Sequence, residues 1–407
     1  MLKTLETVRP LMLNEMQEAR RRIANSIVRT PLVRLDLGAG FPDIRLKLEN
    51  LQATNSYKLR GAVNAVAMLT ESERQLGVWT ISAGNAGQGV AYAARQAGVP
   101  CTVVAIETAP ESKLARMRAL GATLITVPYE AAWRALGDRA YPGVAGTFVH
   151  PFDDHNFIAG HSTMGFEILE DAPDTVAVIG AIGGGGLITG VASALKALKP
   201  EIKIWGAEPE TAAPAALSFS MGSAQVFTDW KASFVDGAGG KSLFPRMWER
   251  LKPVVEGSIV VSLDETKAAM RLMAEKARVI AEGAGSLSLA AALTGKAGKG
   301  PIVAIVSRQH RFAEVLRPRR AVCTLNPPGP CRSPSAGAGS FDTTQFLEPD
   351  ARSMLQQHDC LAVLARPRTN KTLSQVQDRR SSGGFGGPDL PETLEGIHSQ
   401  RRPNDRE

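Results

Sequence analysis

Short apolar segments that alternate with helical segments are the feature that most constrains how this chain folds. The sequence predicts buried strands at residues 77–81, 101–105, 123–127, 176–182 and 302–306, and a helical segment follows most of them. Because a helix between two strands lets both strands run in the same direction, this order predicts parallel sheets with helices on their faces. The chain is therefore predicted to be an α/β protein.

Other segments extend this pattern towards the N-terminus. Residues 44–49 alternate strictly between apolar and polar side chains, which is typical of a half-buried strand. A helix is expected at residues 12–27, with Asn14 as its cap. The remaining helices are expected at residues 62–69, 90–97, 112–120, from about 187, and at 263–279.

Composition and charge exclude several classes of protein. The 407 residues, 44% hydrophobic and 21% charged, are enough for two globular domains. No apolar run reaches the roughly 20 residues that span a bilayer, and no secretory signal is recognised at the N-terminus, so we expect a cytoplasmic protein without a membrane partner. The four cysteines show no metal-ligand spacing.

The net charge of +7 is unevenly distributed. Residues 308–407 carry 15 Lys and Arg against 11 Asp and Glu, so the first 307 residues contribute only +3. A charge this small calls for no polyanionic partner, and we expect no nucleic-acid binding.

Lys58 stands where a polar loop gives way to a helical segment. A lysine at a helix N-terminus lies in a positive field, which favours its neutral, nucleophilic form. The alternative is an ordinary solvated lysine. The sequence around it, E-N-L-Q-A-T-N-S-Y-K-L-R-G-A at residues 49–62, decides between the two.

This segment resembles the lysine segment of the pyridoxal-phosphate-dependent serine/threonine dehydratase family, which usually reads E-x-x-Q-x-T-G-S-F-K-x-R-G-A. The resemblance covers roughly residues 10–307. It implies a fold type II, tryptophan synthase beta-like enzyme with two parallel-sheet α/β domains. It also implies that Lys58 holds pyridoxal 5′-phosphate as a Schiff base.

Four consecutive glycines lie between a buried strand and a helix. Glycines allow close backbone approach to an anion, and a helix N-terminus supplies N–H donors, so this position favours phosphate binding over a merely flexible turn. The tract resembles the phosphate cradle of the family. The residues implied in cofactor binding here are Gly183, Gly184, Gly185, Gly186 and Leu187.

The loop S-A-G-N-A-G-Q-G at residues 82–89 also joins a strand to a helix. Taken alone, it is a helix start capped by Ser82 or Asn85. It resembles the family loop S-[SA]-G-N-H-[AG]-Q-G, which implies that Asn85 hydrogen-bonds the 3′ oxygen of the cofactor. The same resemblance places the substrate carboxylate at Ser82, Asn85 and Ala86.

Ser307 stands where the family reads S-G-G-N, with the serine hydroxyl facing the pyridine nitrogen. A hydroxyl is a poor acid, so the ring nitrogen is expected to stay unprotonated, which favours rapid β-elimination. Ala83 occupies the position of a serine that acts as acid and base in racemising relatives, so elimination is favoured over racemisation. Ala86 replaces the usual histidine and leaves the substrate preference open.

The resemblance therefore implies a threonine or serine ammonia-lyase. Lys58 would abstract the Cα proton of a β-hydroxy amino acid, and the products would be a 2-oxo acid and ammonia. A serine racemase, a threonine synthase-like enzyme and an inactive pseudoenzyme stay open as alternatives. A homo-oligomer, a dimer or a tetramer, is expected.

No metal site is predicted. Asp153, Asp154, His155 and His161 are grouped in a segment that resembles a structural stretch of the family. Some relatives bind a cation through a glutamate, here Glu208, and an aspartate six residues later, but residue 214 is proline. Glu282 is either a charge at a helix N-terminus or a residue near the cofactor ring.

The predicted domains are a large one, residues 1–75 and 151–307, and a small one, residues 76–150. Residues 308–407 hold ten of the 25 prolines and fourteen arginines against one lysine, and we expect them to be disordered. Gly-Gly-Asn-Ile-Asp, written GGC GGC AAC ATC GA(C/T) and read from its third base, encodes Arg-Gln-His-Arg, the residues found at 308–311. We hypothesise that this tail is translated from a shifted frame.

Overall fold

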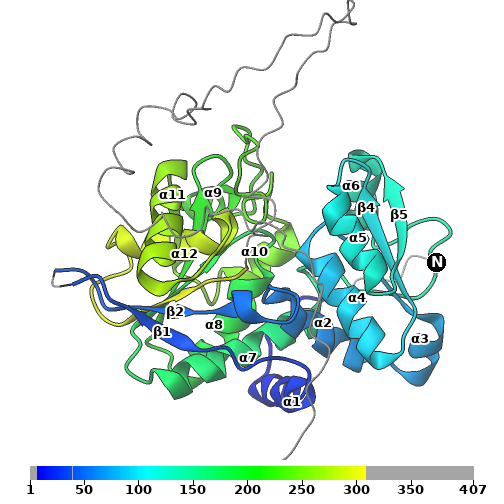
Figure 1. Ribbon diagram of the computed structural model, residues 1–407, viewed down its shortest axis with the longest axis horizontal. Helices are drawn as coiled ribbons and strands as arrows, with labels where there is room; N and C mark the ends of the chain where they lie inside the picture. The colour runs from blue at the N-terminus through cyan, green and yellow to red at the C-terminus, as the bar shows by residue number, and fades with distance from the viewer. Residues whose placement is uncertain (1–6, 39, 309–407) are drawn as a thin grey trace, which may run out of the picture. The chain divides into compact units, whose positions relative to one another are not determined.

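Two β-sheets, each covered by helices on both faces, organise the chain (Figure 1). The computed structural model describes residues 7–38 and 40–308, so the predicted disorder of the tail beyond residue 308 lies outside the described residues. Mixed α/β architecture with parallel sheets confirms the predicted fold class. Within the described ranges, no helix is both long enough and apolar enough to cross a membrane.

The larger sheet has six strands in the order β1-β2-β10-β7-β8-β9. Strand β1 runs antiparallel to β2, whereas β10 lies between β2 and β7 and pairs in parallel with both. The carboxyl ends of β2, β10, β7 and β8 therefore share one edge, where sites in such sheets form. The strands are β1 (Leu32–Leu35), β2 (Ile44–Lys47), β7 (Ala177–Ala181), β8 (Lys203–Pro209), β9 (Gly257–Val261) and β10 (Ile302–Ile305).

Alternating side chains of the large sheet fill two separate cores. Ala177 and Ile179 of β7 pack towards α11 and α12, whereas Val178 packs towards α7 and α8, as the period of two requires. Figure 1 shows α11 and α12 on one face and α7 and α8 on the other. The helices of this part are α1 (Leu13–Ile23), α7 (His155–Asp171), α8 (Gly186–Leu198), α9 (Pro214–Met221), α10 (Pro245–Leu251), α11 (Leu263–Leu272) and α12 (Gly283–Leu293).

The smaller sheet has four parallel strands in the order β5-β4-β3-β6. One face packs against α4 and α5, and the other against α6. Helix α2 packs against both α4 and α7 and so connects the two sheets. The elements are α2 (Lys58–Ala67), α3 (Glu71–Leu76), β3 (Val78–Ile81), α4 (Asn85–Ala97), β4 (Cys101–Ile106), α5 (Glu111–Ala119), β5 (Thr123–Val127), α6 (Tyr129–Asp138) and β6 (Thr147–Phe148). The domain boundaries inferred from sequence stay a prediction.

A buried cluster of charges fixes the start of α2. The Arg60 guanidinium, fully buried, donates to both carboxylate oxygens of Glu49 (2.8 Å each) and to both of Glu167 (2.7 and 2.8 Å). Lys47 Nζ donates to Glu167 as well, at 2.7 Å. Buried charges are tolerated when they are paired and hydrogen-bonded, so this network ties β2, α2 and α7 together.

Several predicted helix boundaries are wrong in instructive ways. The helix predicted from residue 62 begins at Lys58, and the helix predicted from residue 90 begins at Asn85. Both predictions started at the first apolar run and missed the polar first turn. Asn14 lies inside α1: Met12 is the N-cap, and the Glu15 carboxylate accepts its N–H at 2.9 Å.

Candidate functional site

Lys58 begins α2 beside the carboxyl end of β10. The loop that leads to it is held to this strand end, because Asn50 N–H donates to Val306 O and Tyr57 N–H donates to Ser307 O, both at 3.1 Å. The Lys58 ammonium donates to the carbonyl of Pro151. The lysine therefore lies at the edge of the large sheet where the parallel strands end.

The environment of Lys58 favours a neutral amine. Burial, and then the positive charge of Arg308, lower the pKa of Lys58 to about 7. Its Nζ lies 5.2 Å from the ring centre of Tyr57 and 5.4 Å from that of Phe157. The sequence suggested a nucleophilic lysine from the position at a helix N-terminus. In the structure, burial beside the Tyr57 and Phe157 rings also lowers the pKa, ahead of the charge of Arg308.

The predicted substrate loop faces the start of α2 from the smaller sheet. A Cβ added to Gly89 would lie 3.3 Å from the Lys58 carbonyl oxygen, so the first turns of α4 lie against Lys58. Asn85, one turn earlier, begins this helix. Gly84 is the N-cap and Ser82 Oγ accepts its N–H at 3.1 Å, so the cap predicted at Ser82 or Asn85 is wrong.

Of the other predicted residues of this loop, Ser82 and Ala83 are half-buried, whereas Ala86 is buried. Ser82 and Ala83 line a cavity of about 170 Å³ between β3, β4 and α6. Ala86 is buried in the first turn of α4, and its methyl side chain has no polar group, so its N–H is the only group it can offer to a carboxylate.

The glycine turn, residues 183–186, leads into the N-terminus of α8. Gly185 has φ +86°, a conformation that glycine adopts without strain. Gly184 leaves room for the ring of Phe152, with which a Cβ would collide, and a Cβ on Gly186 would lie 2.7 Å from the Phe152 carbonyl oxygen. Close packing of Phe152 thus explains part of the glycine run that sequence reasoning ascribed to phosphate alone.

The same turn opens onto a cavity of about 190 Å³. Gly183 and Gly184 line it together with the loop at residues 236–240. Leu187 has its side chain in the core, 2% exposed, so only its N–H is available to an anion. A helix N-terminus beside this cavity offers N–H donors and positive potential.

Ser307 and Glu282 lie on the large-sheet side of the site. Ser307 is buried two residues beyond β10, and its hydroxyl donates to Ala284 O at 3.4 Å. Glu282 precedes α12 at the N-cap position without a side-chain cap hydrogen bond, and its carboxylate pairs with Arg308. Glu282 therefore stands at a helix N-terminus, one of the two roles left open, and also makes an ion pair that the sequence did not predict.

The acidic and histidine group at residues 153–161 is not brought together. Asp153 pairs with three arginines, Asp154 caps α7 through Phe157 N–H (2.8 Å), and His155 lies 3.4 Å from Glu15. His161 is fully buried, and burial lowers its pKa well below the usual range. Across residues 7–38 and 40–308, no cluster of three His, Cys, Asp or Glu could hold a metal ion.

Glu208 also has a structural partner set. Its carboxylate accepts from Ala215 N–H (2.9 Å), Ala216 N–H (2.8 Å) and Ser258 Oγ (2.8 Å). It therefore satisfies the first turn of α9.

Sequence reasoning missed three features of the site: the Phe152 ring, the loop at residues 236–240, and the Arg308 side chain. The loop carried a usable signal, the run D-G-A-G-G, because glycines so placed mark close approach to a ligand or a turn. Arg308 was visible as a departure from the family's S-G-G-N, but not as a side chain that enters the site. Phe152 carried no signal that a single sequence makes visible.

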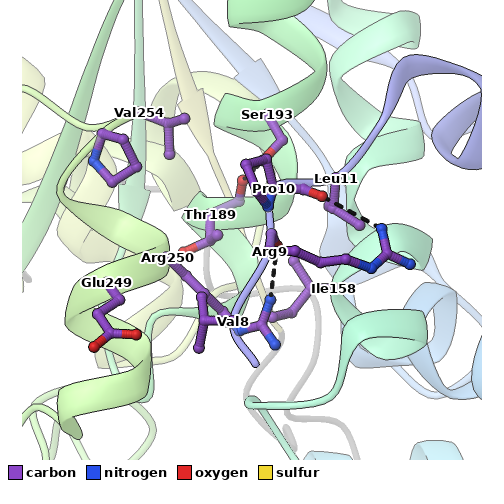
Figure 2. A pocket seen from close by; sticks show the side chains of 11 residues that line it. Val8, Arg9, Pro10, Leu11, Ile158, Thr189, Ser193, Glu249, Arg250 and Val254 are labelled. Atoms are coloured by element: carbon purple, nitrogen blue, oxygen red, sulfur yellow. Dashed lines mark hydrogen bonds between the residues drawn. The ribbon is translucent and has the colours of Figure 1, made fainter. Parts of the chain in front are cut away.

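A separate cavity of about 240 Å³ contains none of the predicted site residues (Figure 2). Residues 8–11, α8 and the segment around α10 surround it, and Arg250 Nη1 donates to Arg9 O at 3.4 Å across it. Its lining is therefore distinct from the residues predicted around Lys58.

A partly buried amine of lowered pKa and a glycine turn at a helix N-terminus share one edge of a parallel sheet. This combination defines an α/β enzyme that can bond a carbonyl compound and hold its phosphate. The chain belongs to the pyridoxal-phosphate dependent enzyme family, whose sequence profile matches residues 23–308. Its cofactor is pyridoxal 5′-phosphate, as the lysine segment implied.

Known proteins resemble the chain over most of its length. It is 40% identical to an L-threonine ammonia-lyase of Thermotoga maritima over 304 residues, covering 72% of this chain and 74% of that protein. It is 37% identical to a catabolic L-threonine dehydratase of Staphylococcus aureus, covering 72% and 86%. These relatives confirm the predicted family.

Solved structures agree in fold. A threonine deaminase of T.th. superposes with a TM-score of 0.67 at 35% identity, covering 74% of this chain and 99% of that one. A serine racemase of Dictyostelium discoideum superposes with 0.68 at 33% identity, covering 74% and 99%. Backbone similarity alone therefore does not separate elimination from racemisation.

The donor set fits the cofactor with one exception. Lys58 provides the amine, the glycine turn provides space and N–H donors for a phosphate, and Ser307 provides a hydroxyl at the strand end. Arg308 is the exception, because its main chain bridges Ser56 of the lysine loop and its cationic side chain, only 12% exposed, lowers the pKa of Lys58.

Proposed function

We propose that the protein is a threonine or serine ammonia-lyase that converts the amino acid to a 2-oxo acid and ammonia. The proposal depends on one observation: Lys58, at the lysine position of the family, is buried and has its pKa lowered to about 7, so its amine can be neutral near neutral pH. The L-threonine ammonia-lyase and dehydratase names of the 40% and 37% identical relatives support threonine as the substrate.

Lys58 is proposed as the proton carrier. Bound pyridoxal phosphate supplies an electron sink that acidifies the Cα–H bond of an attached amino acid. With a pKa of about 7, Lys58 accepts the Cα proton near neutral pH and holds it on Nζ. The substrate loses its α-hydrogen and β-hydroxyl as water, and hydrolysis of the resulting enamine gives the 2-oxo acid and ammonia.

The start of α4 is proposed to bind the substrate carboxylate. Main-chain N–H groups of Asn85 and Ala86 lie in the first turn of this helix, where they attract an anion. The Ser82 N–H donates to Val104 O at 3.0 Å, so Ser82 would contribute its hydroxyl. The Asn85 amide is proposed to hydrogen-bond the 3′ oxygen of the cofactor. Ala83 carries no group that could return a proton, which supports elimination over racemisation.

The glycine turn and Ser307 are proposed to orient the cofactor. Glycines 183–186 and the N–H of Leu187 would hold its phosphate at the start of α8. The Ser307 hydroxyl would face the ring nitrogen. It is too weak an acid to protonate that nitrogen, which supports elimination as the reaction.

The decisive experiment compares three full-length proteins with L-threonine and L-serine as substrates: wild type, Lys58→Ala, and Lys252→Ala as a matched exposed-lysine control. Wild type and the control should form 2-oxo acid and ammonia and absorb at about 410–420 nm, the region of a lysine-bound cofactor. Lys58→Ala should lose both signals.

The alternatives give different results. D-serine formed from L-serine without 2-oxo acid would replace the lyase by a racemase. A wild-type protein that binds the cofactor and turns over neither substrate would support a pseudoenzyme. In an Ala83→Ser variant, any new D-serine formation would confirm that residue 83 faces the reacting carbon.

A cytoplasmic location, a dimer or tetramer, and the domain boundaries near residues 76 and 150 remain proposals from sequence. Cell fractionation tests the first, and size-exclusion chromatography with light scattering tests the second. Limited proteolysis tests the third.

A further inference from the structure

Arg308 enters the site from the end of β10. Its main chain forms an antiparallel bridge with Ser56, two residues before Lys58. A Cβ on Gly285 would collide with its carbonyl oxygen, so its backbone is held between the lysine loop and α12. The side chain is only 12% exposed. A buried arginine requires negative partners.

Two carboxylates hold the guanidinium. Arg308 Nη2 donates to Asp236 Oδ1 at 3.1 Å, and Arg308 Nε pairs with Glu282. Asp236 is also bound by Lys113 of α5, at 3.0 Å. The two acidic groups come from the 236–240 loop and from the start of α12, so the arginine joins two segments that are distant in sequence.

The guanidinium lies against Gly237. A Cβ added to Gly237 would collide with three atoms of the Arg308 guanidinium: Nη1, Cζ and Nη2. On its other side, Gly237 approaches the glycine turn: a Cβ on Gly183 would lie 3.1 Å from the Gly237 carbonyl oxygen. The charge of Arg308 also acts on Tyr57 and lowers the pKa of Lys58. Contacts thus run from Gly183 through Gly237 to Arg308, whose main chain bridges Ser56, two residues before Lys58.

A cofactor bonded to Lys58, with its phosphate at the glycine turn, has to bridge the same two points. We propose that Arg308 is a displaceable plug of the cofactor site: its guanidinium fills the space that the cofactor ring needs, and the cofactor binds only after the side chain leaves Asp236 and Glu282. This inference rests on the cofactor of the family and is independent of which amino acid is the substrate.

The first test is cofactor affinity in the full-length apo protein. Arg308→Gly removes bulk and charge, Arg308→Met keeps much of the bulk and removes the charge, and Arg271→Met on the exposed face of α11 is the matched control. Each is titrated with pyridoxal 5′-phosphate and with pyridoxine 5′-phosphate, which has the ring and phosphate but no aldehyde for Lys58. Calorimetry provides the dissociation constants.

Arg308→Gly should bind both compounds at least about tenfold more tightly than wild type, a change of about 1.4 kcal/mol. The affinity of Arg308→Met should lie between those of wild type and Arg308→Gly, and the affinity of Arg271→Met should match that of wild type. Asp236→Asn, which removes the charge of one of the two carboxylates, should shift the affinity in the same direction as Arg308→Met. Equal or weaker binding by both Arg308 variants would overturn the proposal.

A second measurement needs no variant. Phenylglyoxal modification of Arg308 in the wild-type protein, followed by peptide mass spectrometry, should rise when the cofactor is added, because the side chain moves into solvent. Unchanged or reduced modification would contradict the plug. If wild type has no lyase activity but the cofactor affinities and the phenylglyoxal modification change as expected, the proposed function is wrong and the inference about Arg308 still holds.

Discussion

The titration of Lys58 is the sharpest quantitative consequence of the site. With the ordinary pKa of 10.5, about one lysine amine in 3,000 is neutral at pH 7. With a pKa of about 7, about half of the Lys58 amines are neutral. The structure thus predicts a roughly 1,500-fold larger neutral fraction at this pH.

Competitive labelling measures this fraction directly. Apo protein and N-acetyl-lysine amide, in one tube, receive trace acetic anhydride at a series of pH values, and mass spectrometry follows the peptide that contains Lys58. Because only the neutral amine reacts, labelling of Lys58 should reach half of its plateau near pH 7, while the free amine titrates at about 10.4.

The cause of the low pKa makes a second outcome testable. Burial is the larger cause and Arg308 the smaller, so Arg308→Met should raise the midpoint while leaving it below the ordinary value. A wild-type midpoint above about 9 would refute the argument that burial neutralises this lysine. A midpoint that falls in Arg308→Met would refute the proximity of the two cations.

Three further predictions concern the scaffold. Arg60→Met leaves the buried Glu49 carboxylate without its ion-pair partner and Glu167 with Lys47 alone. It should lower the free energy of unfolding by about 3–5 kcal/mol in urea denaturation, and a loss below about 1 kcal/mol would contradict the role given to the network. Gly184→Ala should cost about 1–3 kcal/mol because its Cβ meets Phe152. Gly137→Ala, on α6 with open space around it, should instead gain up to about 1 kcal/mol, and equal effects of the two would refute the packing argument. Burial raises the pKa of Glu208 from 4.5 to about 7. The stability that the protonated Glu208 contributes should therefore be complete below pH 4.5 and lost as the pH rises through about 7. A series of denaturation curves across this pH range should show the loss in wild type and not in Glu208→Gln.

The parts of the fold that sequence could predict are those governed by periodicity. Strands β3, β4, β7 and β10 lie where apolar runs placed them, because burial on both faces makes a strand largely apolar. Strand β5 was also located, although it is an edge strand with two exposed threonines. Helix starts were misplaced because the first turns of α2 and α4 are polar or glycine-rich. There the chain is fixed by tertiary contacts, such as the Arg60 network, that no local pattern contains.

The site was predictable where a motif lies on adjacent residues and not where it is assembled from distant ones. Lys58 and the glycine turn were found as segments. The pairing of Arg308 with Asp236 and Glu282 joins residues far apart in sequence, and nothing in their local context signals it. The family profile ends at residue 308, where the codon argument places a change of frame, and resequencing the gene there tests that hypothesis.

The hydrogen bonds from the lysine loop to the end of β10 have a practical consequence for protein engineering. The main-chain N–H groups of Asn50 and Tyr57 donate to the carbonyls of Val306 and Ser307. The lysine loop and the end of β10 therefore form one structural unit, which library mutagenesis should leave intact. The loop at residues 82–89 stands on the other sheet and meets this unit through the close approach at Gly89. It is thus the natural module to exchange when a new substrate is sought.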